Sequence, residues 1–431
     1  MKDRTSSSVN REVRRRTQQS SPFVEGQSST GEGSSSRPRS DKVRRTQSPS
    51  MVSPEEEYSQ IPWLDMLPRG RQYDGIEHRL HHEILAYVNY MEATPKEKKT
   101  REAVLSCIRR VVNNRFRNAQ INVFGSCATG LSLPNSDIDV VVTAANIPDV
   151  KDALFKLSSK LKYSGLTNTK IFVNHRAQVP ILTLTTSEEY GSFNVDIGIN
   201  NNLGIEAIDL IKGYLSRMPA LRPLLLVLKG FLRQRNLNDA SRGGLGSYAL
   251  TCLCISFLQV NPRKRPQEFI DKPMETESLG ALLTDFMFYY GFEFPYTTSY
   301  ISVSEGKVLP KSEPMESLSI KCPIRPDYDI SKSVSKLDPF LRAFKEGYAT
   351  ILQFTVVDES MLGQLVRLSL QTVQRRSFIS SLPTLRSSVP LSTNRPYPPS
   401  GSTPRAPRIR NQSYDPRRSD ITRASPMALK Y

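Results

Sequence analysis

Apolar residues recur at helical spacing in the first part of the chain that has a folding pattern. Between residues 76 and 112 they return every three or four positions, as Ile84 and Val88 do, which places them on one face of a helix. Thr94 and Pro95 interrupt this stretch like a helix start, since proline is favoured at the first helical position. The pattern therefore predicts two consecutive helices, the second opening at Pro95.

The spacing changes after residue 120 and becomes helical again after residue 204. Alternating and β-branched runs predict short strands at 121–124, 137–142 and 179–185 and around Asp196, with a helix at 152–161. Helical spacing predicts five further helices, at 205–218, 220–235, 246–260, 278–291 and 336–352. The predicted fold class is α+β, with a small mixed sheet and its helices followed by a mostly helical domain.

Formal charge divides the chain into a nearly neutral middle and two basic ends. The whole chain carries +17; residues 1–50 hold 11 basic and 5 acidic side chains, and residues 375–431 hold 11 and 2. Both ends are rich in Ser, Pro and Arg and poor in large apolar residues, so they cannot bury enough surface to fold. We predict disordered tails at 1–58 and 371–431 around two domains at 59–200 and 201–370. Affinity for phosphate backbones and simple solubility both account for the charge of these tails.

Cysteine usage, hydropathy and basic clusters indicate in which cell compartment the protein works and whether it spans a membrane. The five cysteines show no metal-ligand spacing, and their odd number is typical of free thiols. The most apolar stretch, residues 248–260, is too short for a membrane span and is predicted to be a core helix, so no membrane partner is expected. Basic clusters at residues 14–16 and 42–45 favour the nucleus, with the cytoplasm as the alternative.

A glycine-serine turn and two carboxylates form the most informative stretch of the chain. Gly125 and Ser126 follow a predicted strand and precede a helix start, where backbone N–H groups and a hydroxyl can approach an anion. Asp137 and Asp139 lie two residues apart on a predicted strand and therefore share a face. Neighbouring carboxylates repel each other, so the pair favours a bound cation, and Mg²⁺ prefers carboxylates together with phosphate oxygens.

The string F-G-S-x-x-T-G-L-x-L-P-x-S-D-I-D at residues 124–139 resembles the signature of the DNA polymerase β-type nucleotidyltransferases, in the form of their noncanonical poly(A) polymerase branch. Residues 193–197 resemble the strand of the third catalytic carboxylate, here Asp196, and residues 224–232 and 243–250 resemble the nucleotide-clamp helices. The likeness spans roughly Trp63 to Leu352 and is nearest to the nuclear polymerases of the TRAMP complex. It implies a nucleotidyltransferase palm and a helical PAP-associated central domain.

The resemblance also implies a two-metal phosphoryl transfer and the residues that serve it. The implied cofactors are two Mg²⁺ or Mn²⁺ ions, with Asp137, Asp139 and Asp196 as their ligands. The implied ATP contacts are Gly125 and Ser126 at the β- and γ-phosphates, Lys229 and Ser247 at the triphosphate, Tyr248 stacked on the base, and Asn200 or Asn201 at the ribose or base.

The loop that selects the base in this family departs here from the family pattern. Cys322 stands where Asp is usual, and Tyr328 stands where a base-facing Asn or His is usual. Asp329 alone is retained, as a further candidate ATP contact. Because uridine-preferring members tend to have His at the base-facing position, its absence favours ATP.

The implied function is template-independent addition of AMP from ATP to RNA 3′ ends, in RNA processing and exosome-linked decay. The alternatives are a terminal uridylyltransferase, a DNA-extending polymerase, and a catalytically inactive relative that binds RNA or serves as a scaffold. All three carboxylates are present, which favours an enzyme. No RNA recognition motif, KH pattern or zinc knuckle occurs in the sequence, so a partner is expected to help hold RNA. In a TRAMP-like enzyme the partners would be a zinc-knuckle RNA-binding protein and an RNA helicase.

Two further groups of residues leave more than one interpretation open. His78 and His82 are one helical turn apart and could bind a metal, but the sequence offers no acidic or cysteine partner to complete such a site. Arg233 and Arg235 suit contact with phosphates or RNA as well as a structural role.

Overall fold

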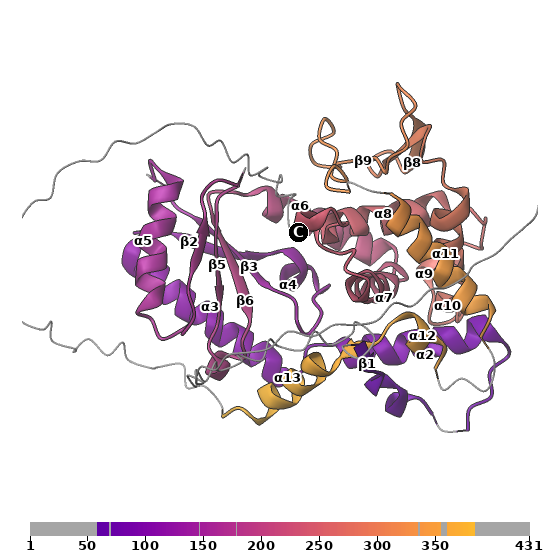
Figure 1. The fold of residues 1–431 in the computed structure, drawn as a ribbon, viewed down its shortest axis with the longest axis horizontal. Helices are drawn as coiled ribbons and strands as arrows, with labels where there is room; N and C mark the ends of the chain where they lie inside the picture. The colour runs from indigo at the N-terminus through magenta and orange to yellow at the C-terminus, as the bar shows by residue number, and fades with distance from the viewer. Residues whose placement is uncertain are drawn as a thin grey trace, which may run out of the picture. The chain divides into compact units, whose positions relative to one another are not determined.

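The computed structural model describes residues 58–383, apart from residues 69, 146, 178, 335–336 and 355–359. The predicted tails therefore lie outside the described residues, except for Tyr58 and residues 371–383. The described chain has two hydrophobic cores, one formed by a sheet with its helices and one formed almost wholly by helices (Figure 1). We refer to these two parts as the palm and the helical domain.

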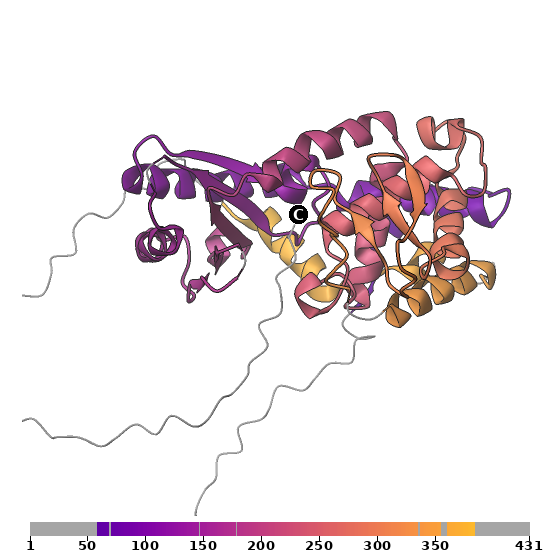
Figure 2. The same ribbon diagram turned by 90° about the horizontal axis from the view of Figure 1, so that it is seen from above.

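The palm is a five-stranded sheet covered on one face by helices. Its strand order is β2-β3-β6-β5-β4, with β3 and β6 parallel and the other pairs antiparallel. The strands are β2 (Gln120–Phe124), β3 (Ile138–Thr143), β4 (Phe172–Asn174), β5 (Ile181–Thr185) and β6 (Asn194–Ile199), with the single turn η2 (Glu188–Tyr190) before β6. Helices α3 (Pro95–Arg115) and α5 (Val150–Lys162) supply most of the rest of this core (Figures 1 and 2). Ile138 and Val140 point into it, so Asp139 faces the opposite side of the sheet.

The helical domain is built around two almost fully buried helices, α7 (Leu221–Gln234) and α8 (Ser247–Val260). The elements around them are η1 (Pro62–Met66), α2 (Ile76–Met91), α6 (Leu203–Arg217), η3 (Ala240–Arg242), α9 (Glu268–Asp271), α10 (Leu279–Phe288) with its π-helical end η4 (Tyr289–Glu293), α11 (Asp338–Leu352) and α12 (Met361–Leu365). The five helices predicted after residue 204 are confirmed to within a few residues. Within the described chain, no helix combines the length and apolarity needed to cross a bilayer.

Two small sheets were not predicted from the sequence. One has the order β8-β7-β9 and consists of β7 (Ser299–Ser302), β8 (Lys307–Pro310) and β9 (Ile320–Lys321). The other pairs β1 (Tyr58–Gln60) with β10 (Leu368–Ser369). Strands of two to four residues carry too few positions for an alternating pattern to stand out.

α2 is one of the leading helices in the range 59–200 assigned to the palm, and it packs into the core of the helical domain. Its carboxylate Glu83 is fully buried and accepts hydrogen bonds from Ser360 Oγ at 2.6 Å and from the backbone N–H of Leu362 at 2.7 Å. These donors lie at the start of α12, so Glu83 satisfies backbone groups that have no partner inside that helix. The chain therefore begins its described part in the helical domain and enters the palm only with α3.

The prediction of a tail from residue 371 onward is wrong for residues 371–381, which belong to helix α13 (Leu370–Ser381). Ile379 on this helix is buried in the palm core. Arg376 pairs with Glu97 of α3 at 3.2 Å and donates to the Glu92 carbonyl at 2.7 Å. The tail prediction failed here because polar residues dominate this helix, and its few apolar residues, such as Val373 and Ile379, are buried only by contact with the two cores. The chain thus returns to the palm at the end of its described part.

Candidate active site

The glycine-serine turn lies directly against one of the predicted carboxylates. β2 ends at Phe124, and α4 (Gly125–Thr129) follows at once. Gly125 has a φ of +64°, and a Cβ at this position would overlap the Asp139 carboxylate. Only glycine meets both requirements, since other residues are strained at this φ and bring a side chain. The turn is therefore shaped to bring backbone and carboxylate together.

The sheet register brings the three predicted carboxylates to one side of the palm. Asp139 on β3 is directly opposite Asp196 on β6, and both side chains are buried. Asp137 comes immediately before β3, and its Oδ1 accepts a hydrogen bond from Asn194 Nδ2 at 3.2 Å. Thr183 on β5 donates to Asp196 Oδ1 at 2.6 Å. Asn194 and Thr183 thus orient two of the three carboxylates, and the sequence analysis identified neither of them.

An arginine from α3 fixes the turn that leads into β3. Arg101 Nη2 donates to the carbonyl of Pro134 at 3.2 Å and to that of Ser136 at 3.0 Å. The same guanidinium lies 4.2 Å from the ring centre of Phe193, which precedes β6. One side chain therefore ties together the segments that carry Asp137 and Asp196. Nothing in the local sequence around Arg101 indicates this role, because its partners lie more than thirty residues away.

The donor set of this site fits a hard divalent cation. Three carboxylates on one side of a sheet supply the oxygen ligands that Mg²⁺ and Mn²⁺ prefer. Burying Asp139 and Asp196 on adjacent strands is unfavourable for two anions unless positive charge is added. The residues present thus match the metal site that the sequence predicts.

Two cavities meet beside the carboxylates. The inner one lies between α4, α6, α7 and α8, and predicted nucleotide contacts are among its lining residues: Gly125, Ser126, Lys229, Ser247 and Tyr248. The outer one is a groove of about 550 Å³ that runs between the palm and the helical domain past Asp137 and Asp139. Ser126, Lys229 and Ser247 line both cavities, so these side chains stand where a ligand in one would meet a ligand in the other.

Lys229 is half-buried on the mostly apolar helix α7, at the junction of the two cavities. Its Nζ donates to the Leu131 carbonyl at 2.8 Å. Burial lowers the pKa of Lys229 to about 8, and the nearby carboxylates Asp139 and Asp137 oppose that shift. An anionic ligand beside this partly desolvated ammonium would stabilise its charged form, because the anion would replace the hydration that the ammonium has lost.

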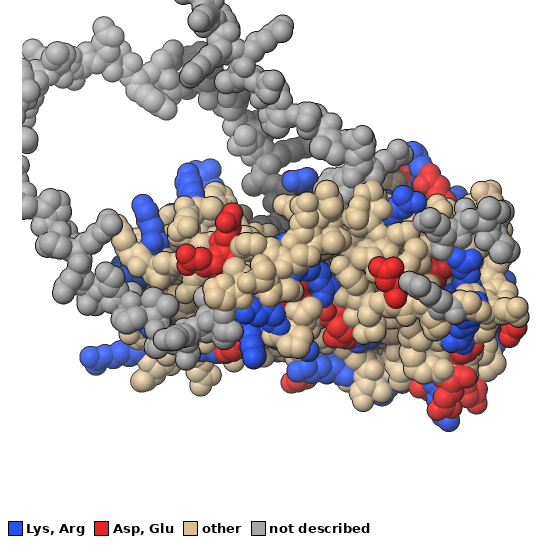
Figure 3. All heavy atoms as spheres, turned by 90° about the horizontal axis from the view of Figure 1, so that it is seen from below, with Lys and Arg blue, Asp and Glu red and all other residues tan. Residues whose placement is uncertain are grey.

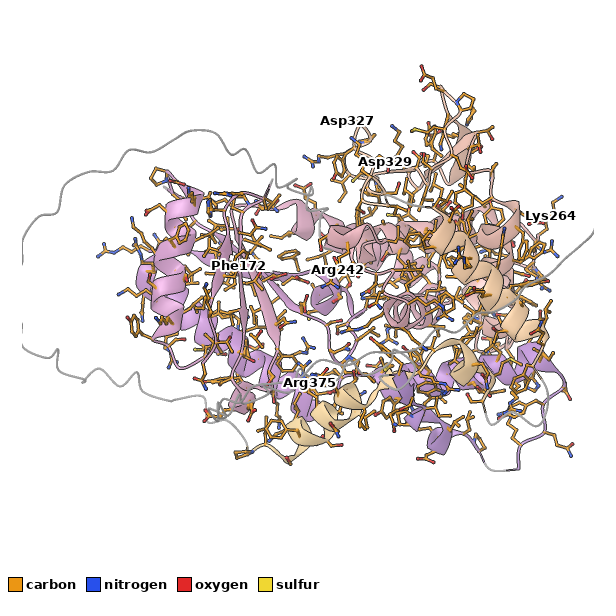
Figure 4. All side chains as sticks on the ribbon, viewed as in Figure 1. Phe172, Arg242, Lys264, Asp327, Asp329 and Arg375 are labelled. Atoms are coloured by element: carbon orange, nitrogen blue, oxygen red, sulfur yellow. The ribbon has the colours of Figure 1, made fainter. Side chains whose placement is uncertain are left out.

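The helical domain lines the outer groove with polar side chains that lie near the end of α7 and beyond it. Figure 4 shows Arg242 between the two domains. The groove residues on this side include Arg233, Asn236, Asn238, Asp239 and Arg242. Arg235 is placed differently: its guanidinium lies 3.7 Å from the Phe231 ring centre and donates to the Leu365 carbonyl at 3.1 Å. Of the two arginines singled out in the sequence, Arg233 lines the groove and Arg235 is structural.

The structure does not bring three other predicted ATP contacts to either cavity. Asn200 and Asn201 are absent from both linings, and the Asn200 side chain pairs with the backbone of Ala144 at 2.9 and 3.0 Å. Asp329 also lines neither cavity; Figure 4 shows it on the loop that carries Asp327. Its carboxylate accepts from Ser319 Oγ at 2.7 Å and from the Ser331 backbone N–H at 2.8 Å.

Lysine, arginine and acidic side chains are interspersed on the face of the molecule drawn in Figure 3. The view agrees with the near-neutral charge of the middle of the chain. This face of the described residues therefore carries no broad basic patch.

Comparisons with known proteins agree with this arrangement. The family profile for the central palm domain of mitochondrial-like poly(A) RNA polymerases matches residues 80–216, and the Cid1 family poly A polymerase profile matches residues 278–341. A solved structure described as the polymerase core of TRAMP, an RNA surveillance complex, is 31% identical with a TM-score of 0.63, over 71% of this chain and 99% of that one.

Two relatives show how far the likeness extends. Poly(A) RNA polymerase protein 1 of Saccharomyces cerevisiae is 33% identical over 68% of this chain and 46% of its own length. The inactive non-canonical poly(A) RNA polymerase protein Trf4-2 of Drosophila melanogaster is 30% identical over 70% of this chain and 76% of its own length. The chain spans about a third to a half of the length of the fungal poly(A) RNA polymerases that it matches.

Proposed function

Since this chain belongs to the non-canonical poly(A) RNA polymerase family, we propose that it transfers AMP from ATP to the 3′ end of RNA without a template. The observation that carries the proposal is the placement of Asp139 opposite Asp196 and against Gly125. This arrangement sets anionic ligands beside a phosphate-binding turn, at the junction of an inner cavity and an open groove.

Asp137, Asp139 and Asp196 would hold two divalent ions, Mg²⁺ or Mn²⁺. When bound, such ions would favour deprotonation of the RNA 3′-hydroxyl and would neutralise charge on the triphosphate and the leaving pyrophosphate. Asn194 and Thr183 keep Asp137 and Asp196 turned toward the groove side of the sheet. Their contribution is to fix the ligands in advance, which lowers the reorganisation needed during the reaction.

The nucleotide would lie where the two cavities meet, because the inner one, at about 20 Å³, is too small to hold all of it. Gly125 and Ser126 present backbone N–H groups and a hydroxyl to the phosphates, and Lys229 and Ser247 add donors from the helical domain. Tyr248 lines the inner cavity and can pack against the base. Because these donors come from both domains, a bound triphosphate would hold palm and helical domain in one arrangement.

The outer groove would take the RNA 3′ end. Its lining pairs Asn194 and Asn135 of the palm with Arg233 and Arg242 of the helical side. Guanidinium groups bind phosphate through parallel hydrogen bonds, whereas amides can bind sugar and base edges. RNA in this groove would place its terminal hydroxyl next to the carboxylates.

Adenine preference remains part of the proposal because the base-selecting loop is atypical. Tyr328 is half-buried against the helical core, and its carbonyl accepts from the Cys322 backbone N–H at 2.8 Å. A closed loop without histidine at this position favours ATP over UTP, following the family trend. Terminal uridylyl transfer is the alternative that a nucleotide panel would reveal.

An inactive protein is the second candidate, because a Drosophila relative that this chain covers over 76% of its length is named inactive. Against it, all three carboxylates stand on one side of the sheet, and Gly125 makes room for one of them. Binding RNA requires neither feature, and clustered acids oppose it.

We also propose a nuclear role in RNA processing and decay, with RNA 3′ ends as substrate. A zinc-knuckle RNA-binding protein and an RNA helicase would be the partners. The likeness to the polymerase core of an RNA surveillance complex supports this assignment.

Primer extension tests the proposed activity. An oligo(A) primer would be incubated with each NTP separately, in Mg²⁺ and in Mn²⁺, with wild-type protein and with Asp139→Asn. We expect ATP-dependent extension that the variant lacks. Extension with UTP alone would identify a uridylyltransferase, and no extension in either metal would identify an inactive relative.

A further inference from the structure

Two histidines and a glutamate meet on the helical domain, and the glutamate is far from the histidines in the sequence. His78 Nε2 lies 2.6 Å from Glu277 Oε2, and His82 Nε2 lies 3.2 Å from Glu277 Oε1. The two Nε2 atoms lie 3.1 Å apart. Among the groups of three or more His, Cys, Asp and Glu that the structure describes, only this one has ligand atoms that all lie within 4.8 Å of one another. Glu277 is the acidic partner that the sequence did not reveal.

The geometry points to a binding site for a zinc-type divalent metal ion formed by His78, His82 and Glu277. Zinc binds imidazole nitrogen at about 2.0–2.1 Å and carboxylate oxygen at about 2.0–2.2 Å, so donor atoms around a tetrahedral ion are roughly 3.3 Å apart. Two of the three donor separations are already close to that value. The third is that of a short hydrogen bond and has to open by less than about 1 Å.

Two helices bring these residues together. His78 and His82 are one turn apart on α2, and Glu277 stands in the turn between α9 and α10. α2 and α10 cross closely here, since a Cβ on Gly280 would overlap the Glu77 carbonyl (Figure 1). The ligands therefore sit on two backbones whose separation is fixed by packing, which is what a preformed metal site needs.

The backbone at Glu277 is strained. Its φ is +50°, in the left-handed region that non-glycine residues rarely adopt. Such strain persists only where the surroundings enforce it, and it concentrates at functional positions. Here it turns the Glu277 carboxylate toward the two imidazoles.

His78 has a carboxylate near each of its ring nitrogens, Glu277 at Nε2 and Asp74 at Nδ1. Its Nδ1 accepts the Asp74 backbone N–H at 2.9 Å, and the Asp74 carboxylate is 3.9 Å away. With metal on Nε2, Nδ1 would carry the ring proton, so the hydrogen bond from the Asp74 N–H would open and Nδ1 would instead donate to the Asp74 carboxylate, as metal-bound histidines do to carboxylates beside them.

Other groups around the cluster are compatible with a bound ion. The ring of Tyr73 packs 5.7 Å from both imidazole rings and shields them from one side. Arg71 Nη2 lies 3.3 Å from Glu277 Oε1, the oxygen that contacts His82, whereas Oε2 contacts His78. The fourth position of the ion would be left for water, because these three residues are the ligands.

The site is separate from the proposed catalytic centre, since none of its residues lines either cavity. A bound ion would connect α2 to the start of α10 and stabilise the folded helical domain by an amount that rises with the logarithm of the ion concentration once this exceeds the dissociation constant. The inference therefore does not depend on the proposed nucleotidyl transfer.

Cobalt substitution tests the site. Full-length protein would be freed of metal with a chelator and titrated with Co²⁺, whose visible absorption is intense in tetrahedral sites and weak in octahedral oxygen sites. We expect an intense spectrum that Zn²⁺ abolishes by displacement. Glu277→Gln preserves the size of the side chain and removes its charge, and it should weaken binding by at least about 10-fold.

His175→Ala is the matched control, because His175 lies in the palm and outside the cluster. This variant should keep the wild-type spectrum, and Zn²⁺ should raise the Tm of wild type and His175→Ala but not of Glu277→Gln. A wild-type protein without the tetrahedral spectrum, or equal spectra in wild type and Glu277→Gln, would overturn the proposal and leave the cluster as a hydrogen-bonded contact between helices.

Discussion

Asp139 and Asp196 lie opposite each other on the parallel strands β3 and β6, and both are buried. Two buried carboxylates on neighbouring strands repel each other in the absence of cations, so the fold gains little from keeping both charges. Asp139→Asn should therefore leave the Tm unchanged or raise it, while primer extension falls by at least about 100-fold. Calorimetry and extension assays on the same preparation measure the two effects. Asp152→Asn, an exposed carboxylate on α5, is the control and should change neither.

Gly125 offers a second test, because its missing side chain makes room for Asp139. Gly125→Ala adds a methyl group that overlaps the Asp139 carboxylate, and it also strains the backbone. Gly130→Ala is the matched control, since φ there is +75° and nothing lies within 4 Å of the added Cβ. Gly130→Ala should lose about 1–2 kcal/mol of unfolding free energy from backbone strain alone, and Gly125→Ala should lose more because of the overlap. Only Gly125→Ala should lose extension activity. Equal activities would show that the close approach to Asp139 has no functional role.

Lys229 predicts a pH dependence for nucleotide affinity. Burial lowers its pKa to about 8, so the free protein loses this positive charge as the pH rises through that value. We expect the KM for ATP to rise above about pH 8 in wild type and to stay high and nearly flat in Lys229→Met. Comparison of the KM profiles of the two proteins tests this.

The same group makes a stability prediction of defined sign. Between the lowered pKa and the ordinary value near 10.5, the unfolded chain binds a proton that the folded chain has lost, so wild-type stability rises with pH in that window. Lys229→Met removes the penalty for burying the charge and should be more stable than wild type below about pH 8. Chemical denaturation at pH 7 and pH 9.5 measures the difference, which should shrink as the pH rises. A difference that grows with pH would show that Lys229 stabilises the fold as a charged residue.

Residues close together in the sequence allowed much of this site to be predicted. Gly125, Ser126, Asp137 and Asp139 belong to one short stretch, and the alternation of the strand after Asp137 already indicates a shared face. The placement of Asp196 depends on a parallel pairing between β3 and β6, and only the family resemblance made it visible. The core helices after residue 204 could be predicted equally well from the sequence, because their apolar periodicity runs over many turns.

Residues whose partners are distant in the sequence were missed for a physical reason. The sequence alone gives no sign of a special role for three such residues. In the fold, Arg101 bonds to Ser136, Thr183 bonds to Asp196, and Glu277 meets the α2 histidines. Asn200 and Asp329 show the converse. Both had plausible ligand roles from their positions in the family pattern, yet local backbone groups take up their side chains.

Glu83 should be among the residues on which the stability of the helical domain depends most. It is fully buried on α2, pairs with Arg79 at 2.9 Å and accepts hydrogen bonds from the start of α12. Glu83→Gln places an amide before N–H donors and leaves Arg79 without its ion pair, which should cost about 3–5 kcal/mol. Glu102→Gln breaks an exposed pair with Arg109 and should cost less than about 1 kcal/mol. Similar losses in both variants would contradict the assigned role of Glu83.

Helix α13 predicts where the C-terminal part of the chain can be shortened. Its residue Arg376 donates to the Glu92 carbonyl and pairs with the buried carboxylate of Glu97 on α3, while Ile379 fills the palm core. Removing residues 370–431 would leave Glu97 without its cation and open the core, so the Tm should fall by several degrees. Removing residues 384–431 alone spares all of these contacts and should leave the Tm within about 1 °C of the full-length value. Thermal melting of the two truncated proteins decides the matter. If both melt like the full chain, α13 adds nothing to the stability of the palm.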